Sequence, residues 1–493
     1  MDGKFPIASK LWKQIPAAIQ AVLLEALRRL WEKIDRLQGR NQELERQVQQ
    51  LAQQVQTLQE RLGKNSSNSS KPPSTDGPHV KRAPPQPRSR RKRGGQPGHA
   101  QRQRTLVPTQ DCQEVIPVKP SACRGCGARL TGDDPAPRRH QVWEVPPVQP
   151  EVREFRIHSL VCSGCGQRTC GQLPTGVPSG QFGPRLISWV ALLMGVYRLS
   201  KRQAQQLGQD VWGLPISLGQ ICRLQEHTRQ VLDPVVQEAR EYVPGEPANV
   251  DETRWVENKT RCWLWVAVTQ WVTVYLIRAT RGADVLWEIL GETYAEVVTS
   301  DRAKAYDTLP LSQRQLCWAH LRRDFQAMID RRNAGAKLGE SLLFLADLML
   351  SAWAKVRAGK RTRRWFVGLL EDFVRQDVHL LLEQGAACRC SKTAATCREL
   401  LTREEALWTF AYAEGVEPTN NAGERAALPP VQYRKTSFGT DSPCGSRFLE
   451  NIFTVAASCR PPSRNIWEYL TTCHQLHLLG QPLPSLLPKG AET

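Results

Sequence analysis

Two aspartates, Asp251 and Asp301, occupy positions where the strands of one sheet would bring their side chains together. Asp251 lies in a strand-like segment, residues 248–255, and Asp301 ends a second such segment, residues 296–301. Two more strand-like runs and a helix-like run lie between them, at residues 262–268, 272–277 and 283–290. Three strands, a helix and a further strand form the opening of a ribonuclease-H-like fold, in which the first and fourth strands are neighbours. We therefore expect the two carboxylates to meet in an α/β core of this kind.

Neighbouring carboxylates are suited to the chemistry of phosphodiester bonds. Attack on a phosphodiester builds negative charge, and two Mg²⁺ or Mn²⁺ ions about 3.5 to 4 Å apart can stabilise both the attacking and the leaving oxygen. Carboxylate oxygens are the hard ligands that these ions prefer. Without the ions, the carboxylates would repel one another and raise each other's pKa values. Asp251 and Asp301 therefore predict a site for two divalent ions.

A third carboxylate is harder to choose from residue types alone. Glu417 and Glu424, seven residues apart, both lie in the second part of the predicted core. Asn421 could cap a helix, and Glu424 would then be its partner in a capping box, which is a purely structural role. Spacing and chemistry leave both glutamates open as the third ligand.

Two CxxCG sequences predict a second kind of metal site. Cys123 and Cys126 form one pair, and Cys162 and Cys165 form the other. Four thiolates are enough for a closed, tetrahedral, structural Zn²⁺ site, and the glycine after each pair lets the turn tighten around sulfur. The gap between the pairs is longer than in the commonest zinc ribbons, so we expect strands within residues 141–160 to return the chain. The alternative is four free thiols.

The composition points to a nucleic acid partner. The chain has 493 residues and a formal charge of +19, from 67 Lys and Arg against 48 Asp and Glu. Such an excess suits a polyanion, and this length predicts several domains. No apolar run approaches the roughly 18 to 20 residues that span a bilayer, and the first residues contain no apolar stretch of a secretory signal. We expect a cytoplasmic, nucleoid-associated protein without membrane contact.

Residues 23–62 carry a heptad pattern. One seam position holds leucine throughout, and the other holds mostly aliphatic side chains with Asn41 among them: Leu23, Leu30, Leu37, Leu44, Leu51 and Leu58; then Leu27, Ile34, Asn41, Val48, Val55 and Leu62. This pattern favours a two-stranded parallel coiled coil, in which the asparagine pairs across the seam, and so predicts a homodimer. The alternative is an amphipathic helix packed in the protein's own core.

Two further regions are candidates for DNA contact. Between Gly77 and Gln110 the chain has nine Lys or Arg and no acidic residue, which suits a flexible segment that follows a phosphate backbone. Residues 182–243 read as helices, with Ser200 and Ser217 as N-caps around a turn. This arrangement is compatible with a helix-turn-helix that reads a major groove, although helical hairpins are also common in cores.

More than a hundred residues separate Asp301 from Glu424, and most of them read as helices, at residues 338–358, 362–376 and 392–401. A plain ribonuclease-H-like fold needs far fewer. We interpret this stretch as a helical insertion before the last catalytic helix.

The chain resembles the transposases of insertion-sequence family sixty-six. The resemblance rests on several stretches in family order, among them KNSSNSSKPPSTD, both CxxCG pairs, VDETRW, SDRAKAY, LCWAHLRRDF, VEPTNNAGERA, YRKTSFGTDSPCGSRFLENIFTVAASCR and RNIWEYL. It implies a transposase with two aspartates and a glutamate on a ribonuclease-H-like core. The family motifs place this triad at Asp251, Asp301 and Glu424, which would hold two Mg²⁺ or Mn²⁺ ions. The implied partners are the inverted repeats of the element, target DNA and, in some relatives, accessory proteins.

The resemblance also marks Cys317 and His320, a Cys-x-x-His pair whose role the sequence leaves open between packing and catalysis. The chain departs from the family after Glu424, where it reads AALPP, and again at SCRPPSRN. These changes keep an alternative open, a catalytically decayed dimeric DNA-binding protein. A ribonuclease-H-like nuclease unrelated to mobility fits the long helix and the cysteine pairs less well.

The predicted organisation is multidomain. In chain order it has a coiled-coil helix, a flexible basic linker, a zinc-knuckle module, a helical DNA-binding region, the first part of the core, the helical insertion, the second part of the core and a tail: residues 1–63, 64–110, 111–175, 176–243, 244–335, 336–412, 413–480 and 481–493.

Overall fold

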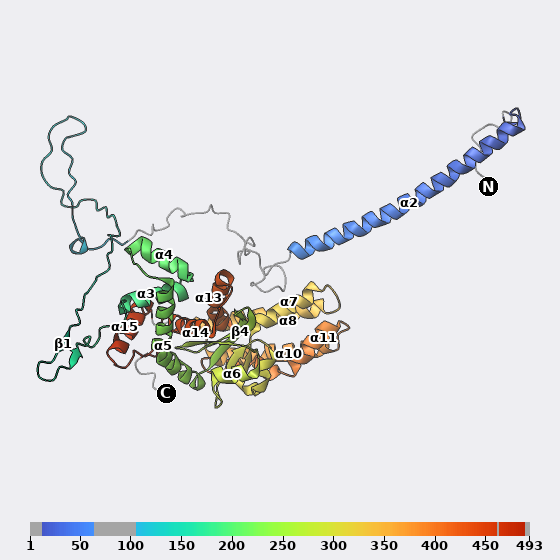
Figure 1. Ribbon diagram of the computed structural model, residues 1–493. Helices are drawn as coiled ribbons and strands as arrows, with labels where there is room; N and C mark the ends of the chain where they lie inside the picture. The colour runs from blue at the N-terminus through green and yellow to red at the C-terminus, as the bar shows by residue number, and fades with distance from the viewer. Residues whose placement is uncertain (1–11, 64–104, 461–462, 489–493) are drawn as a thin grey trace. The chain divides into compact units, whose positions relative to one another are not determined.

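The computed structural model describes residues 12–63, 105–460 and 463–488 (Figure 1). The chain divides into two compact units, Met1–Ala83 and Pro84–Thr493. Most of the predicted basic linker, residues 64–110, lies outside the described residues. No helix in the described ranges is both long and apolar enough to cross a lipid bilayer.

The described part of the first unit contains one long helix, α2 (Ala17–Gly63). It covers the whole heptad pattern and ends at Gly63, as the sequence predicts. The leucines of the seam from Leu30 to Leu58 are exposed along it. Within residues 12–63, this apolar stripe is open to solvent, as it would be for pairing with a partner helix.

The second unit begins with the two cysteine pairs, each in its own tight loop. The first loop is closed by a bridge between Ala122 and Arg129, and the second by the antiparallel hairpin of β1 (Ser159–Val161) and β2 (Arg168–Cys170). The expectation of strands within residues 141–160 is wrong except at its end, where β1 starts. The run contains Val142, Val145, Val148 and Val152, but these side chains are exposed and prolines interrupt the run.

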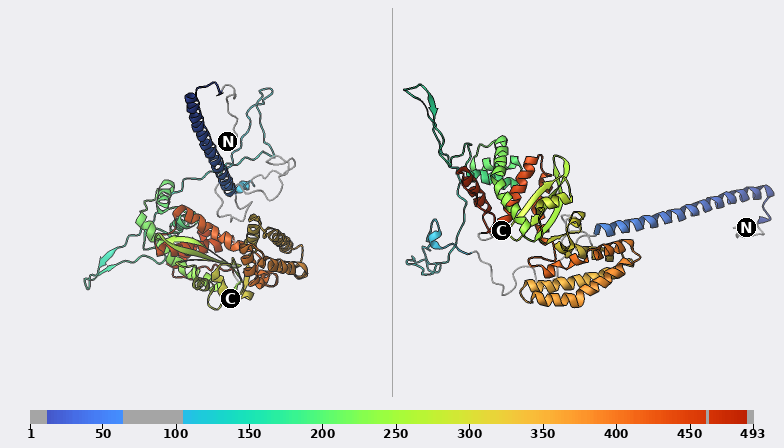
Figure 2. Two further views of the ribbon diagram at one scale, coloured as in Figure 1. Left: turned by 90° about the vertical axis from the view of Figure 1, so that its right-hand side faces the viewer. Right: turned by 90° about the horizontal axis from the view of Figure 1, so that it is seen from below.

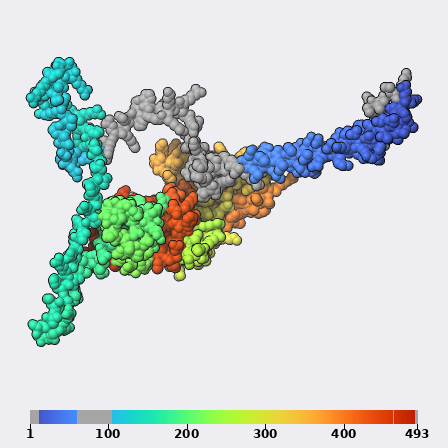
Figure 3. Space-filling view, turned by 45° about the horizontal axis from the view of Figure 1, so that its top comes forward, coloured from blue at the N-terminus to red at the C-terminus, as the bar shows by residue number. Residues whose placement is uncertain are grey.

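Three helices follow, α3 (Pro184–Gly195), α4 (Lys201–Trp212) and α5 (Leu218–Tyr242). Ser200 and Ser217 cap α4 and α5 as predicted, each in a full capping box with the glutamine three residues later. Gly213 ends α4 in the left-handed conformation, at φ 61°, which a residue without Cβ adopts freely. In the space-filling view of Figure 3, this green segment lies on the surface, and most side chains of α4 are exposed.

A five-stranded sheet forms the centre of the second unit, in the order β5-β4-β3-β6-β7. In this sheet β3, β4 and β5 are antiparallel neighbours, and β6 and β7 continue it parallel to β3. Their bounds are β3 (Ala248–Glu257), β4 (Thr260–Val268), β5 (Thr273–Arg278), β6 (Val298–Ser300) and β7 (Arg314–Leu316). The four predicted strands and the predicted helix, α6 (Ala283–Leu290), are confirmed, and β7 is an addition.

Helices from the end of the chain cover one face of the sheet. α13 (Asn421–Ser437) packs on β3 and β4, and α14 (Pro443–Ser458) packs on β5 (Figures 1 and 2). α5 packs on the other side of α14, and α15 (Ile466–Leu478) packs on α3. The result is a mixed α/β core in which buried aliphatic and aromatic side chains fill the space between sheet and helices.

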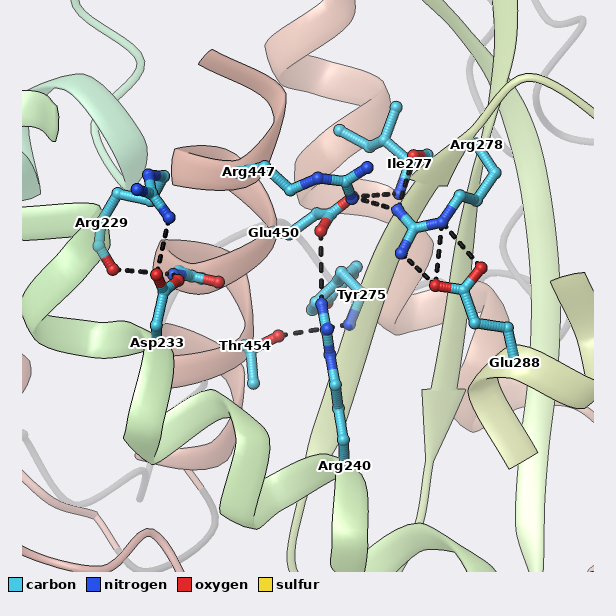
Figure 4. A network of polar contacts seen from close by, with 11 residues as sticks. Arg229, Asp233, Arg240, Tyr275, Ile277, Arg278, Glu288, Arg447, Glu450 and Thr454 are labelled. Carbon is cyan, nitrogen blue, oxygen red and sulfur yellow. Dashed lines mark hydrogen bonds and ion pairs between the residues drawn. The ribbon is translucent and has the colours of Figure 1, made fainter. Parts of the chain in front are cut away.

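The edge strand β5 is protected by side chains of α14. Every second amide of β5 donates to a side-chain oxygen of α14, and each acceptor lies about one turn closer to the start of that helix than the one before. The pairs are Thr273 N to Ser458 Oγ at 3.0 Å, Tyr275 N to Thr454 Oγ1 at 3.2 Å, and Ile277 N to Glu450 Oε1 at 2.6 Å. Figure 4 shows the last two, with the carboxylate of Glu450 among the guanidinium groups of Arg240, Arg278 and Arg447. This lateral cover keeps the edge from pairing with another chain.

The stretch predicted to be helical forms a bundle of helices with its own hydrophobic core, yellow to orange in Figure 2. Its helices are α7 (Trp318–Asp330), α8 (Ala336–Arg357), α9 (Arg363–Leu369), a π-helical turn (Leu370–Val374), α10 (Arg375–Ala386), α11 (Ser391–Leu401) and α12 (Thr409–Tyr412). The helix expected to end at residue 376 continues to Ala386, because Val378 and Leu382 still pack in this core. Trp353, Phe366 and Phe410 contact one another at its centre, with ring centroids 5.0 to 5.6 Å apart.

Candidate active site

The register of the sheet places Asp251 and Asp301 at the same height on neighbouring strands. β3 and β6 are parallel, and Asn249 pairs with Thr299. Asp251 and Asp301 each lie two residues further along their strand. Because side chains alternate along a strand, Asp251 shares the face of Asn249, which donates to Asn420 Oδ1 at 3.1 Å beside the start of α13. The expectation that these aspartates lie side by side is therefore supported by the backbone alone.

Glu424 lies in the first turns of α13, over that same face. The predicted capping box does not form: α13 begins at Asn421, and the N-cap residue Asn420 makes no side-chain cap. Instead, Asn420 Nδ2 donates to the carbonyl oxygen of Val250 at 2.7 Å, directly before Asp251. This bond holds the start of α13 against β3. The carboxylate of Glu424 takes no part in capping the helix, and its charge acts on Asp251.

The rival glutamate has a different role. Glu417 Oε2 accepts a hydrogen bond from Trp353 Nε1 at 3.0 Å and lies 3.4 Å from a guanidinium nitrogen of Arg357, both on α8. These contacts hold it on the insertion, beside a cavity of about 260 Å³. Of the two glutamates, Glu424 is the one whose charge acts on Asp251.

The electrostatics of Asp251 show how closely the carboxylates gather. Burial raises the pKa of its carboxyl to about 8, and the charges of Glu252, Asp301 and Glu424 act in the same direction. A hydrogen bond from the amide of Glu252, at 3.0 Å, opposes this only in part. A cation in the site would offset the part of the shift that comes from these charges, since all of them are negative.

Asp301 is fixed at the end of β6 by its own turn. Its Oδ1 accepts a hydrogen bond from the amide of Ala303 at 2.8 Å, and its Oδ2 lies 3.6 Å from a guanidinium nitrogen of Arg281. About a quarter of its side chain, 27%, is exposed, so the carboxylate is accessible from solvent. The carboxylate of Asp301 is therefore held in one orientation and stays accessible to solvent.

The structure adds a buried group that the sequence gave no reason to single out. Glu252, on the opposite face of β3 from Asp251, accepts a hydrogen bond from Tyr306 Oη at 2.6 Å and pairs with Arg281. Burial and the nearby charge of Asp301 raise its pKa. Arg281 thus bridges Glu252 and Asp301. Glu252 and Tyr306 lie within the stretches VDETRW and SDRAKAY, but only the fold brings them together.

Cys317 and His320 also lie at this site. Cys317 follows β7 and is the N-cap of α7, and its sulfur accepts a hydrogen bond from the amide of Asn420 at 3.0 Å. His320 Nδ1 lies 3.6 Å from Glu424 Oε1, as does a guanidinium nitrogen of Arg323. Burial and the neighbouring Arg323 lower the pKa of His320 to about 4, so its ring is neutral at physiological pH.

The cysteine pairs form two separate knuckles of the same geometry. In each, the amide of the first cysteine donates to a carbonyl five residues later, and Gly127 and Gly166 take positive φ angles of 76° and 73° to close the turn. Backbone amides of the loop lower the pKa of Cys123 and of Cys162, the first thiol of each pair. Cys126 and Cys165 complete the pairs, but in the described residues the four sulfurs are not gathered into one cluster.

Two comparisons with known proteins show what the chain is similar to. The family described as "Transposase IS66 family" matches residues 179–447, more than half of the chain, and a family of unknown function, DUF6444, matches residues 14–105. The chain is 25% identical over 389 residues to the uncharacterized protein y4qI of Sinorhizobium fredii, covering 71% of this chain and 69% of the relative. The first match contains all three carboxylates, and on that match the chain belongs to the IS66 family of transposases.

Proposed function

We propose that this chain is a DNA transposase in which Asp251, Asp301 and Glu424 form the catalytic metal site. The observation that carries the proposal is that Asp301, at the end of β6, and Glu424, on α13, both act electrostatically on the buried carboxyl of Asp251 on β3. Burial raises the pKa of Asp251 first, and the repulsion by neighbouring carboxylates adds to it; a cation would relieve that repulsion. The order of the sheet, three antiparallel strands followed by two parallel ones, supports its assignment to the ribonuclease-H-like fold.

The donor set fits Mg²⁺ or Mn²⁺, because it consists of carboxylate oxygens that are partly open to solvent. Two such ions would supply charge stabilisation for the attacking and leaving oxygens of a phosphodiester. The chain's own contribution is to fix the ligands. The turn at Ala303 orients Asp301, the Asn420–Val250 bond sets the position of Glu424, and the burial of β3 keeps Asp251 in place.

Other regions would hold the DNA. The exposed surface of α4 and the capped start of α5 are our candidates for contact with the inverted repeats, together with the basic residues before Thr105. The exposed leucine stripe of α2 supports a parallel homodimer that would pair two element ends in one complex. Thiolate pairs with lowered pKa values suit Zn²⁺, and a shared ion would join the two knuckles of Cys123, Cys126, Cys162 and Cys165 into one module.

The direct test is incubation of the full chain with DNA from the ends of its own element and Mg²⁺, with the products mapped to the nucleotide. We expect cleavage that leaves a 3′-OH at the element end, followed by joining to target DNA. Asp251→Ala should abolish both steps, whereas Glu417→Gln, which changes the rival carboxylate, should preserve them. Cleavage by Asp251→Ala at the unaltered rate would refute the site.

A second candidate function is supported by a specific feature of the catalytic helix. Pro429 and Pro430 lie inside α13, five and six residues after Glu424, and each removes a backbone donor from the helix. A copy weakened in this way would occupy its element ends without cutting them. Specific binding of end DNA without nicking at any Mg²⁺ or Mn²⁺ concentration would identify this function and exclude the first.

A further inference from the structure

Three potential ligands of different chemistry meet at the start of α7. The ligand atoms of Cys317, His320 and Glu424 all lie within 4.8 Å of one another, and this is the one group of its kind in the described residues. Cys317 and His320 are three positions apart at the first turn of a helix, a spacing that puts both side chains on one side. Glu424 reaches them from α13. Two separate elements therefore build the group.

Two details of the group resemble a binding site more than a packed core. His320 Nδ1 is buried and has no hydrogen-bond partner, and Glu424 Oε1 lies 3.6 Å from it. A buried polar atom without a hydrogen-bond partner destabilises the folded protein, and a bound ligand that interacts with the atom would remove this cost. The sulfur of Cys317 accepts a hydrogen bond from the amide of Asn420, which favours the thiolate, whereas burial, the larger effect, raises the pKa of the free thiol.

We propose that Cys317, His320 and Glu424 form a second metal site, one that takes a thiophilic divalent cation such as Zn²⁺ and not Mg²⁺. Sulfur, imidazole and carboxylate together are a ligand set for Zn²⁺, Co²⁺ or Cd²⁺, whereas Mg²⁺ requires oxygen ligands. Bonds of about 2.0 to 2.3 Å would place the ligand atoms of a tetrahedral ion roughly 3.3 to 3.7 Å apart. The Nδ1–Oε1 distance of 3.6 Å already meets this requirement, and the sulfur needs only a small shift.

Binding is an exchange of one proton for the metal ion. The thiol of Cys317 loses its proton to water, the neutral imidazole gives the lone pair of Nδ1, and the carboxylate of Glu424 completes three protein ligands. No other bond changes. Metal affinity at this site should therefore rise with pH, because the proton competes for the sulfur.

Occupation of this site would act on catalysis through Glu424, a consequence that rests on the proposed function. The carboxylate is shared by the two sites, and it cannot serve a thiophilic ion beside α7 and the catalytic ions beside Asp251 at once. Zn²⁺ should therefore inhibit Mg²⁺-dependent DNA cleavage by competition. The inhibition should be reversed by a chelator with preference for Zn²⁺.

The test titrates the metal-free full chain with Co²⁺, which gives a sulfur-to-metal absorption band when a thiolate is a ligand. Three variants are compared with the unaltered chain: Cys317→Ser, His320→Gln and, as a matched control, Cys397→Ser, which removes another buried cysteine within the insertion. We expect the first two variants to bind one thiolate-ligated Co²⁺ fewer, or at least about tenfold more weakly. The control should bind as the unaltered chain does. The knuckle cysteines contribute equally to all four proteins.

Equal Co²⁺ binding and equal absorption in all four proteins would overturn the proposal. A second readout then adds Zn²⁺ to the cleavage assay at fixed Mg²⁺, where Cys317→Ser should resist inhibition. If Co²⁺ binds as expected and Zn²⁺ inhibits both proteins alike, the competition through Glu424 is wrong. If no protein cleaves DNA, the proposed function fails while the Co²⁺ titration still decides the metal site.

Discussion

The carboxylate site and the cysteine knuckles differ in what holds them together. Asp251, Asp301 and Glu424 come from elements far apart in the chain, and the packing of sheet and helices lets the charges of Asp301 and Glu424 act on the buried Asp251. Each cysteine knuckle is complete as a local turn, but its residues are mostly exposed and the two knuckles stay separate. The protein core thus positions the carboxylates, whereas in our proposal only a bound ion would join the two knuckles.

The largest effect should follow from the loss of one ligand of the core-built site. Glu424→Gln keeps the size of the side chain but removes its charge, and we expect DNA cleavage to fall by more than about a hundredfold, since even indirect metal contacts are worth 10- to 100-fold. The measurement is the initial rate of end cleavage at saturating Mg²⁺. Glu417→Gln is the control, and a similar loss in that variant would mean that the wrong glutamate has been assigned.

The next largest effect should be on stability, through the carboxylate that anchors the edge strand. Glu450 is fully buried and pairs with Arg240, Arg278 and Arg447 (Figure 4). Glu450→Ala would remove the carboxylate partner of Arg240 and Arg447, while Arg278 would keep Glu288, and should lower the free energy of unfolding by about 3 to 5 kcal/mol.

Urea unfolding of the full chain measures this loss. The matched control is Glu468→Ala, which removes the exposed partner of Arg185 and should cost less than about 1 kcal/mol. Equal losses in the two variants would contradict the structural role given to Glu450.

The crowding of carboxylates predicts a pH dependence of stability without metal. The pKa of Asp251 is about 8 in the folded chain and near 3.8 when unfolded. The folded state therefore holds the proton more tightly, so this group's stabilisation is complete below about pH 4 and declines until about pH 8.

Thermal unfolding of the chain and of Asp251→Asn in chelator, at pH 5 and pH 8, tests this. The asparagine variant should be relatively more stable at pH 8 than at pH 5, and Mg²⁺ should stabilise the unaltered chain more than the variant at pH 8. A difference between the two proteins that does not change with pH would show that Asp251 is not crowded.

The smallest effect on the core should come from the knuckles. Cys162→Ser should abolish amide protection across residues 159–170 in hydrogen exchange, yet change the unfolding free energy of the sheet by no more than about 0.5 kcal/mol. Cys170→Ser, beside the knuckle, serves as the control. Unfolding of the sheet in the Cys162 variant would mean that the two regions are more alike than their packing indicates.

Strands and helices with strong patterns could be predicted from the sequence, and weakly marked ones could not. β4, β5 and α6 contain apolar runs between turn residues, so their positions could be predicted from the residue pattern. β7 contains Arg314 and Gln315, both buried, and Arg314 is accommodated only because Asp307 pairs with it. No apolar run in the sequence predicts such a strand.

Some residues of the candidate site could also be predicted from the sequence, and others could not. Asp251 and Asp301 could be placed from strand order, because neighbouring parallel strands fix their relation. From residue types and spacing, Glu424 could not be told from Glu417, because the separate role of Glu417 depends on contacts with Trp353 and Arg357, 64 and 60 positions earlier in the chain. The bridge from Arg281 to Glu252 and Asp301 is equally invisible in sequence, since it joins three elements by side chains alone.

The central claim, that three distant carboxylates form one metal site, is tested most directly by Mn²⁺ binding to the full chain, followed by calorimetry or by paramagnetic resonance. The account predicts two bound ions, with affinity lowered at least about tenfold by each of Asp251→Asn, Asp301→Asn and Glu424→Gln, and unchanged by Glu417→Gln. Mn²⁺ binding that survives the loss of any one of the three carboxylates would contradict it.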